Sequence, residues 1–295
     1  MSTTTKVATL LTLWLSGSLR LVGQVPSPLA RVDQRLDGVA DSGTYLVYWY
    51  RINNASESRG GAAYFSLDVS APRGTGFPTL PATGRFMHGA GFRGVDLAQF
   101  QDHVPVGPIS PTNWESVLTK QATLDWYGGR GGASGEYDNI PPGDSLGGFG
   151  LRSPYLPGIR QSWARPTFLS CCAKPRAATA TSEAEYPDPS EFKISGRTVG
   201  PTVRPEAMTL GLVRADLAQV CGALRWIPDG AMCGPLQATL ARAAAAAQRG
   251  DRSAATDALR AFVDALDAQH GPGKPVNDNA YWLLKVNAKY LLAHM

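Results

Sequence analysis

The residues with the clearest catalytic potential are a serine, an aspartate and a histidine. Ser145 lies in the run Gly143-Asp-Ser-Leu146, and Asp267 precedes His270 by three residues. A serine hydroxyl becomes a nucleophile when an imidazole accepts its proton and a carboxylate orients that imidazole. These residues therefore define one candidate activity, acyl transfer, with Ser145 as nucleophile, His270 as base and Asp267 as the orienting group.

The local sequence around the serine argues against that activity. The run 143–146 resembles the signature of the GDSL-type (SGNH) esterases, and the aspartate–histidine pair resembles their Asp-x-x-His block. In that family the nucleophile follows a buried parallel strand, whereas here Asn139-Ile-Pro-Pro142 precedes it. The run also fits a Gly-x-Ser-x-Gly elbow, which needs a helix after the serine, and Gly147-Gly-Phe-Gly150 does not favour one. We expect a turn that enters a strand and keep a secreted serine esterase as the alternative function.

The four cysteines form two pairs in the sequence. Cys221 and Cys233 flank the turn Trp226-Ile-Pro-Asp-Gly230, and in an exported protein this spacing suits a disulfide that closes a loop. Neither cysteine has a second ligand at metal-binding spacing, so we expect no metal and no other cofactor. Cys171 and Cys172 are adjacent, and a free thiol, a bond between chains and exchange with the other pair all stay open.

Two patterns suggest binding to other molecules. Aromatic side chains could form a sugar-stacking surface, although aromatic residues in strands usually belong to the core; the candidates are Tyr48, Tyr50, Trp114, Trp126 and Tyr127. The tripeptide Arg249-Gly-Asp251 matches a cell-adhesion motif. A helix that ends at the glycine, followed by a helix that the aspartate caps, explains the same residues.

The N-terminus predicts an export signal. Lys6 supplies a positive charge, Val7–Leu19 is apolar and uncharged, and Gly23 offers a cleavage point. The apolar run is shorter than the ~20 residues that span a bilayer. Removal of residues 1–23 takes Lys6 and Arg20 from 28 basic residues and nothing from 24 acidic ones, so the mature chain is nearly neutral. We expect a secreted or cell-surface protein with no membrane span and no nucleic-acid partner.

Two aromatic and β-branched runs predict the first strands of a sheet. Gly43–Ile52 is apolar on both alternating sides, as in the middle of a sheet, and Ala63–Val69 turns Phe65 and Leu67 one way and Tyr64, Ser66 and Asp68 toward water. The turn-forming pair Asn53-Asn54 and the Ser/Gly-rich connection after it predict a hairpin.

Later segments add to the same sheet architecture. Residues 118–126 alternate as one strand, with Leu124 and Trp126 toward the core and Asp125 toward water. Ser145–Ser153 and Ile159–Phe168 predict further strands. Several short strands separated by turn residues favour a β-sandwich over βαβ units.

The C-terminal third has helical periodicity. Apolar residues recur at helical spacing in four segments, which lie within residues 210–224, 236–247, 255–266 and 283–291. Asp251 and either Asn277 or Asp278 are suitable N-caps. Asn287 falls on the apolar stripe of the last helix, so it needs a hydrogen-bond partner.

Three runs within this region resemble a known family. Leu236–Ala247, Arg249–Val263 and Gly273–Leu284 are similar to the small helical module of the FIMAH type, which occurs at the C-termini of many extracellular bacterial proteins. The resemblance implies an accessory module on an exported bacterial protein, without an agreed activity. The front part, with Ile140-Pro-Pro-Gly143 and Gly147-Gly-Phe149, loosely resembles β-sandwich domains of exported bacterial proteins.

These features predict an α+β multidomain protein. We expect an antiparallel β-sandwich over 32–168, a polar linker or extended edge segment over 169–205, and a small disulfide-stapled four-helix module over 206–295. The expected function is non-catalytic, in ligand binding, surface display or a structural role. The sequence does not identify the extracellular ligand, and a glycan and a surface protein are the two candidates.

Overall fold

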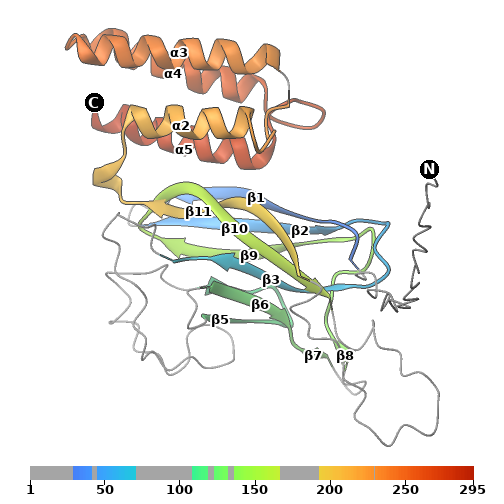
Figure 1. Cartoon of the computed structure of the whole chain (residues 1–295). Coiled ribbons are helices and arrows are strands. Elements are labelled where there is room, and N and C mark those ends of the chain that lie inside the picture. Colours follow the sequence, from blue (N-terminus) through green and yellow to red (C-terminus); the bar gives the residue numbers. More distant parts are fainter. Residues whose placement is uncertain are drawn as a thin grey trace, which may run out of the picture.

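The computed structural model describes residues 29–41, 45–70, 108–118, 123–131, 136–166, 193–228 and 230–295. In these residues two antiparallel sheets face each other, and four α-helices lie beyond one side of the pair (Figure 1). The predicted α+β class, with a sandwich followed by C-terminal helices, is confirmed. The predicted export signal at residues 1–23 lies outside the described residues, as do Cys171 and Cys172.

Sheet A places β2 between two other strands, as the two apolar sides of this strand predict. The strand order is β1-β2-β9-β4. The bounds are β1 Val32–Asp41, β2 Leu46–Asn54, β9 Ser145–Ser153 and β4 Pro108–Ile109. Tyr48, Tyr50 and Ile52 of β2 are buried, whereas Trp49 is half-buried on the opposite side of the strand.

Sheet B has five strands in the order β11-β10-β3-β6-β5. Their bounds are β11 Ile194–Val203, β10 Leu156–Pro166, β3 Ala62–Asp68, β6 Thr123–Gly128 and β5 Trp114–Leu118. A separate short ladder joins β7 (Arg130–Gly131) to β8 (Glu136–Tyr137).

Aromatic rings from both sheets interlock in the core between them. Phe65 of β3 and Trp126 of β6 stack with centroids 4.9 Å apart, and Tyr50 of β2 lies 5.6 Å from Phe65. Phe149 of β9 meets Phe65 edge-on at 5.8 Å. All four rings are almost fully buried, so sheet-on-sheet packing of aromatic side chains makes this core.

The predicted hairpin between the first two aromatic runs is wrong. β2 pairs with β1 and β9, while β3 pairs with β10 and β6, so the connection carries the chain from sheet A to sheet B. β2 and β3 therefore lie in opposite sheets, and their aromatic side chains meet across the core. The Asn54 side-chain amide fixes this crossing because it donates to the carbonyl oxygens of Gly60 and Ile140, at 3.0 and 2.9 Å.

Two other segments also differ from the prediction. Residues 118–126 contribute to two strands, β5 and β6, which pair from Trp114–Gly128 to Leu118–Leu124. Within 169–205, residues 194–203 form β11, an edge strand of sheet B, so the extended edge segment is correct there and the polar linker is wrong. Residues 169–192 lie outside the described residues.

The four helices follow the predicted periodicity. They are α2 Leu210–Cys221, α3 Gly230–Gln248, α4 Arg252–Ala268 and α5 Asp278–His294, and a 3-10 turn, η3 (Pro205–Ala207), leads from β11 into α2. Side chains of Asp251 and Asn277 accept backbone N–H groups and cap α4 and α5. In the described residues, no helix is long and apolar enough to cross a membrane.

Helix α5 joins the helical layer to the sandwich. It packs against β1, β10 and β11, with α2 beside it and α3 and α4 farther out (Figure 1). Asn279 accepts the N–H of Leu36 at 2.7 Å and the hydroxyl of Thr198 at 3.2 Å, which ties β1 to β11. Asn287 donates to the carbonyl oxygen of Pro157 at 3.0 Å, and this is the partner that its place on the apolar stripe requires.

Candidate functional site

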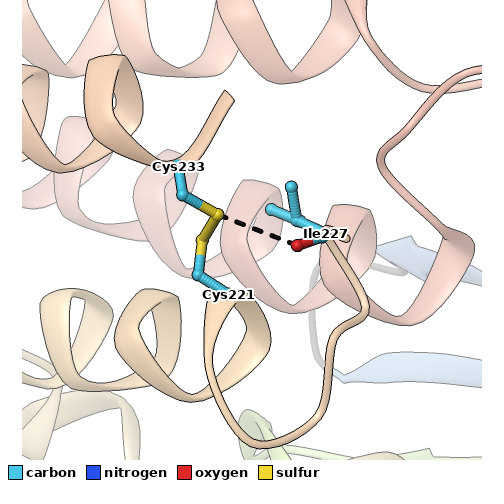
Figure 2. The surroundings of a disulfide bond; sticks show 3 residues. All are labelled: Cys221, Ile227 and Cys233. Carbon is cyan, nitrogen blue, oxygen red and sulfur yellow. Dashed lines mark hydrogen bonds between the residues drawn. A yellow bond between two sulfur atoms is a disulfide. The ribbon is translucent and has the colours of Figure 1, made fainter. Parts of the chain in front are cut away.

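The predicted disulfide is present in the structure. Cys221 ends α2 and Cys233 lies in the first turn of α3, with their Cα atoms 6.0 Å apart (Figure 2). Figure 2 also shows the Cys233 sulfur against the carbonyl oxygen of Ile227, at 3.8 Å. Cys233 and Ile227 are buried, so the disulfide joins α2 to α3 across a turn that packs into the core.

Ser145 lies outside any nucleophile elbow. It is the first residue of β9, is exposed, and pairs with Asn53 of β2 in sheet A. A turn precedes it, in which the Asp144 N–H donates to the carbonyl oxygen of Pro141 at 3.1 Å. The chain therefore enters a strand after a turn, as the local sequence predicts.

The other two residues of the esterase hypothesis have different partners. Asp267 accepts hydrogen bonds from the Tyr281 hydroxyl at 2.8 Å and from Lys285 Nζ at 2.6 Å. His270 Nε2 lies 2.8 Å from Asp278 Oδ1, and its ring stacks on Tyr281 with centroids 3.7 Å apart. Both side chains are bound to α5, and the structure does not join either of them to the serine.

The Asp267 cluster is an electrostatic contact between helices. Burial raises the pKa of the Asp267 carboxyl, but hydrogen bonds from Lys285 and Tyr281 outweigh it and hold that pKa below its ordinary value. The carboxylate is therefore ionised and is a counterion for Lys285.

The adhesion tripeptide forms the junction between α3 and α4. Gly250 has a φ of 74°, a conformation that glycine adopts readily. The Asp251 carboxylate accepts the N–H of Ala254 at 3.0 Å and caps α4. The end of α3 and the N-cap of α4 thus account for the glycine and the aspartate.

Most of the predicted aromatic surface belongs to the core. Tyr48, Tyr50, Trp114 and Trp126 are all buried, and Tyr127 is half-buried on the outer side of β6. The residues that share this outer face with Tyr127 come from the neighbouring strands.

An aromatic row crosses the outer face of sheet B. We define it as Trp163 of β10, Tyr64 of β3 and Tyr127 of β6, three half-buried side chains on adjacent strands. Tyr64 and Tyr127 are cross-strand partners, and their rings stack with centroids 6.0 Å apart. Trp163 is opposite Ser66, the residue two positions after Tyr64, so its side chain projects on the same face.

Charged groups line the aromatic row. Arg165 lies over the Tyr64 ring, 4.9 Å from its centroid, and contacts Asp125 at 3.3 Å. Lys193 Nζ lies 3.9 Å from the Trp163 centroid, and burial together with Arg165 lowers the pKa of Lys193. The Tyr127 hydroxyl donates to Glu115 at 2.9 Å.

This face also contains polar atoms with spare hydrogen-bonding capacity. Asp125 Oδ1 and Arg165 Nε are buried and lack a hydrogen-bond partner among the described residues. Asp125, predicted to face water, points away from the core but is covered. The half-buried aromatic faces, with charged side chains beside them, can bind a ring that is apolar on its faces and polar at its rim.

The sequence prediction missed Trp163 and placed Tyr64 on a water-facing side only. The signal that could have placed both residues on the outer face is the alternation of side chains along their strands. Strand β10 turns Ser162 and Ala164 inward, both fully buried, and therefore turns Trp163 outward.

Comparison with known proteins bears on the helical layer. Residues 227–293 match the family model of the FIMAH domain. The match covers α3, α4 and α5, about a quarter of the chain, and begins after α2, so the predicted four-helix module contains a three-helix FIMAH region and one further helix. Neither a curated protein nor a solved structure matches the chain.

Proposed function

We propose that this is an exported bacterial protein with a non-catalytic role, and that the aromatic row of sheet B is its glycan-binding face. The row carries the proposal, because three aromatic side chains on adjacent strands lie beside an arginine, a lysine and two carboxylates. Sugar rings present C–H groups to aromatic faces and hydroxyls to charged groups. Such a face therefore binds a saccharide by stacking and hydrogen bonding together.

Export is supported by two independent features. The FIMAH region is a type of module found in extracellular bacterial proteins, and the Cys221–Cys233 disulfide is typical of an oxidising compartment. The non-catalytic role is supported by the partners of Asp267 and His270, which lie on α5.

The test uses the mature chain on an array of bacterial and host glycans and on peptidoglycan. We expect saturable binding to at least one saccharide class, and Trp163→Ala or Tyr64→Ala should weaken it about tenfold. Trp49→Ala, on the outer side of sheet A, is the matched control and should bind like the unaltered protein. Binding that all three variants retain equally, or no binding on the whole array, contradicts the proposal.

A second assay separates this role from the esterase alternative. The unaltered protein should not hydrolyse short-chain nitrophenyl esters, and a fluorophosphonate probe should not label Ser145. Labelling that Ser145→Ala abolishes would overturn the non-catalytic role.

A further inference from the structure

A groove separates helix α5 from the end of sheet A. Its volume is about 360 Å³, within the size range of small-molecule sites. One wall comes from β1 and β2, the other from the last three turns of α5, and Leu156 at the start of β10 also lines it. It is distinct from the aromatic row, which lies on the outer face of sheet B.

The inner part of the groove is apolar and incompletely covered. Val39 and Leu46 on the sandwich side and Val286 and Tyr290 on the helix side are half-buried. These side chains pack against the core and also face the groove. An apolar group in the groove would remove their remaining surface from water, which is favourable.

The helix side of the groove is cationic. Lys285, Lys289 and His294 line it, but Lys285 already binds Asp267 at 2.6 Å. Lys289 is exposed and carries the charge available to a ligand. His294 is held at the rim, because its Nδ1 donates to the carbonyl oxygen of Tyr290 at 2.8 Å and its ring stacks on Tyr290.

The two walls of the groove differ in charge. Asp41 lies on the sandwich wall and Lys289 on the α5 wall, so the negative end of a ligand is favoured on the helix side.

We propose that this groove binds an amphipathic anion, an apolar chain or ring that carries one carboxylate or sulfate group. The apolar part packs between Val39, Leu46 and Val286, and the anionic group meets Lys289 beside His294. This site goes beyond the proposed glycan face and does not depend on it. A ligand in it contacts both the sandwich and the FIMAH region, and so stabilises their junction.

Isothermal titration calorimetry of the mature chain tests the ligand class with four probes. Octanoate and octyl sulfate should bind, 1-octanol should bind at least tenfold more weakly, and acetate should not bind detectably. Equal affinity for octanoate and 1-octanol would overturn the anionic preference. Absence of octanoate binding at millimolar concentration would overturn the site.

Variants locate the binding. Lys289→Ala should weaken octanoate about tenfold and leave 1-octanol unchanged, whereas Lys274→Ala, an equal charge change in the turn between α4 and α5, should have no effect. Ala293→Phe fills the groove from an exposed position and should abolish binding of both octyl compounds. Ala247→Phe, on the exposed side of α3, controls for the added ring. Unaltered octanoate affinity in Ala293→Phe contradicts the proposal.

Discussion

Apolar packing runs through the helical layer and across its junction with the sandwich, and the junction adds buried amides that bind strand backbone. Within the layer, apolar stripes pack together and the Cys221–Cys233 disulfide closes the turn between α2 and α3. At the junction with the sandwich, two asparagines of α5 bind strand backbone, and these side chains are 4% and 0% exposed for Asn279 and Asn287.

The difference concerns specificity. Apolar packing tolerates small shifts, because it depends mainly on the area removed from water. A buried amide tolerates no such shift, because displacement leaves its partner unsatisfied at a cost of about 1–3 kcal/mol. Asn279 therefore fixes the position of α5 against β1 and Asn287 fixes it against β10, and the helix belongs as much to the sandwich as to the FIMAH region.

The largest expected effect comes from breaking the junction. Asn279→Leu keeps the branched shape of the side chain but leaves the Leu36 N–H and the Thr198 hydroxyl without their acceptor. We expect the free energy of unfolding to fall by about 4 kcal/mol, measured by urea denaturation. Gln237→Leu, at an exposed position of α3, is the control. A loss below about 1 kcal/mol would mean that apolar contacts alone hold α5 in place.

Removal of the Cys221–Cys233 disulfide tests the contacts within the helical layer. The Cys221→Ser/Cys233→Ser double variant should lose about 3 kcal/mol of unfolding free energy, because the bond closes a loop of 12-residue separation in the unfolded chain. Peptide mapping of the non-reduced protein checks the pairing. A peptide that links either cysteine to Cys171 or Cys172 would refute it.

The free energy of unfolding should also depend on pH through an aspartate of the helical layer. Burial raises the pKa of Asp216, on α2, to about 7, although a hydrogen bond with Asn287 opposes the shift. The folded state thus binds a proton more tightly than the unfolded state, so this group destabilises the fold as the pH rises from about 4 to about 7.

Asp216→Asn removes that penalty. Relative to the unaltered protein, the variant should gain as much as about 4 kcal/mol of unfolding free energy at pH 8 and almost nothing near pH 4. Denaturation at both pH values measures the difference, in which the other titrating groups cancel. A gain of equal size at pH 4 and pH 8 would contradict the assigned cause.

The smallest expected effect lies inside the helical layer. Asp251→Ala deletes the N-cap of α4 and should cost about 1 kcal/mol, while Asp251→Ser should restore most of it. Thermal unfolding of the three proteins is the measurement. Equal stability of the alanine and serine variants would show that the cap contributes little.

The sequence predicted those elements whose signal is local. Helix spacing gave α2 to α5, and the two apolar sides of β2 indicated an inner strand of a sheet. Strand pairing is not local, so the expected β2–β3 hairpin failed although both strands were found. Strand β1 was missed as an element because its buried side includes the polar residue Gln34 and its register shifts between Leu36 and Gly38, which breaks the alternation.

The candidate binding face was harder to predict for a different reason. Alternation shows that a strand has two sides but not which side faces the core. In β10 the small residues Ser162 and Ala164 lie inside and are fully buried, so Trp163 is left outside. The groove beside α5 could not be predicted either, since its two walls are joined only in the folded chain.

The contact between Leu36 and Asn279 also determines the order in which this protein can be completed. The two residues are 243 positions apart, and a ribosome makes β1 well before α5. Until α5 emerges, the Leu36 N–H has no Asn279 to bind, and an uncovered strand edge can pair with another chain. The N–H of Leu36 in β1 is therefore satisfied only after α5 has been made, and a truncation before residue 278 leaves a nearly complete sandwich with an edge open to aggregation.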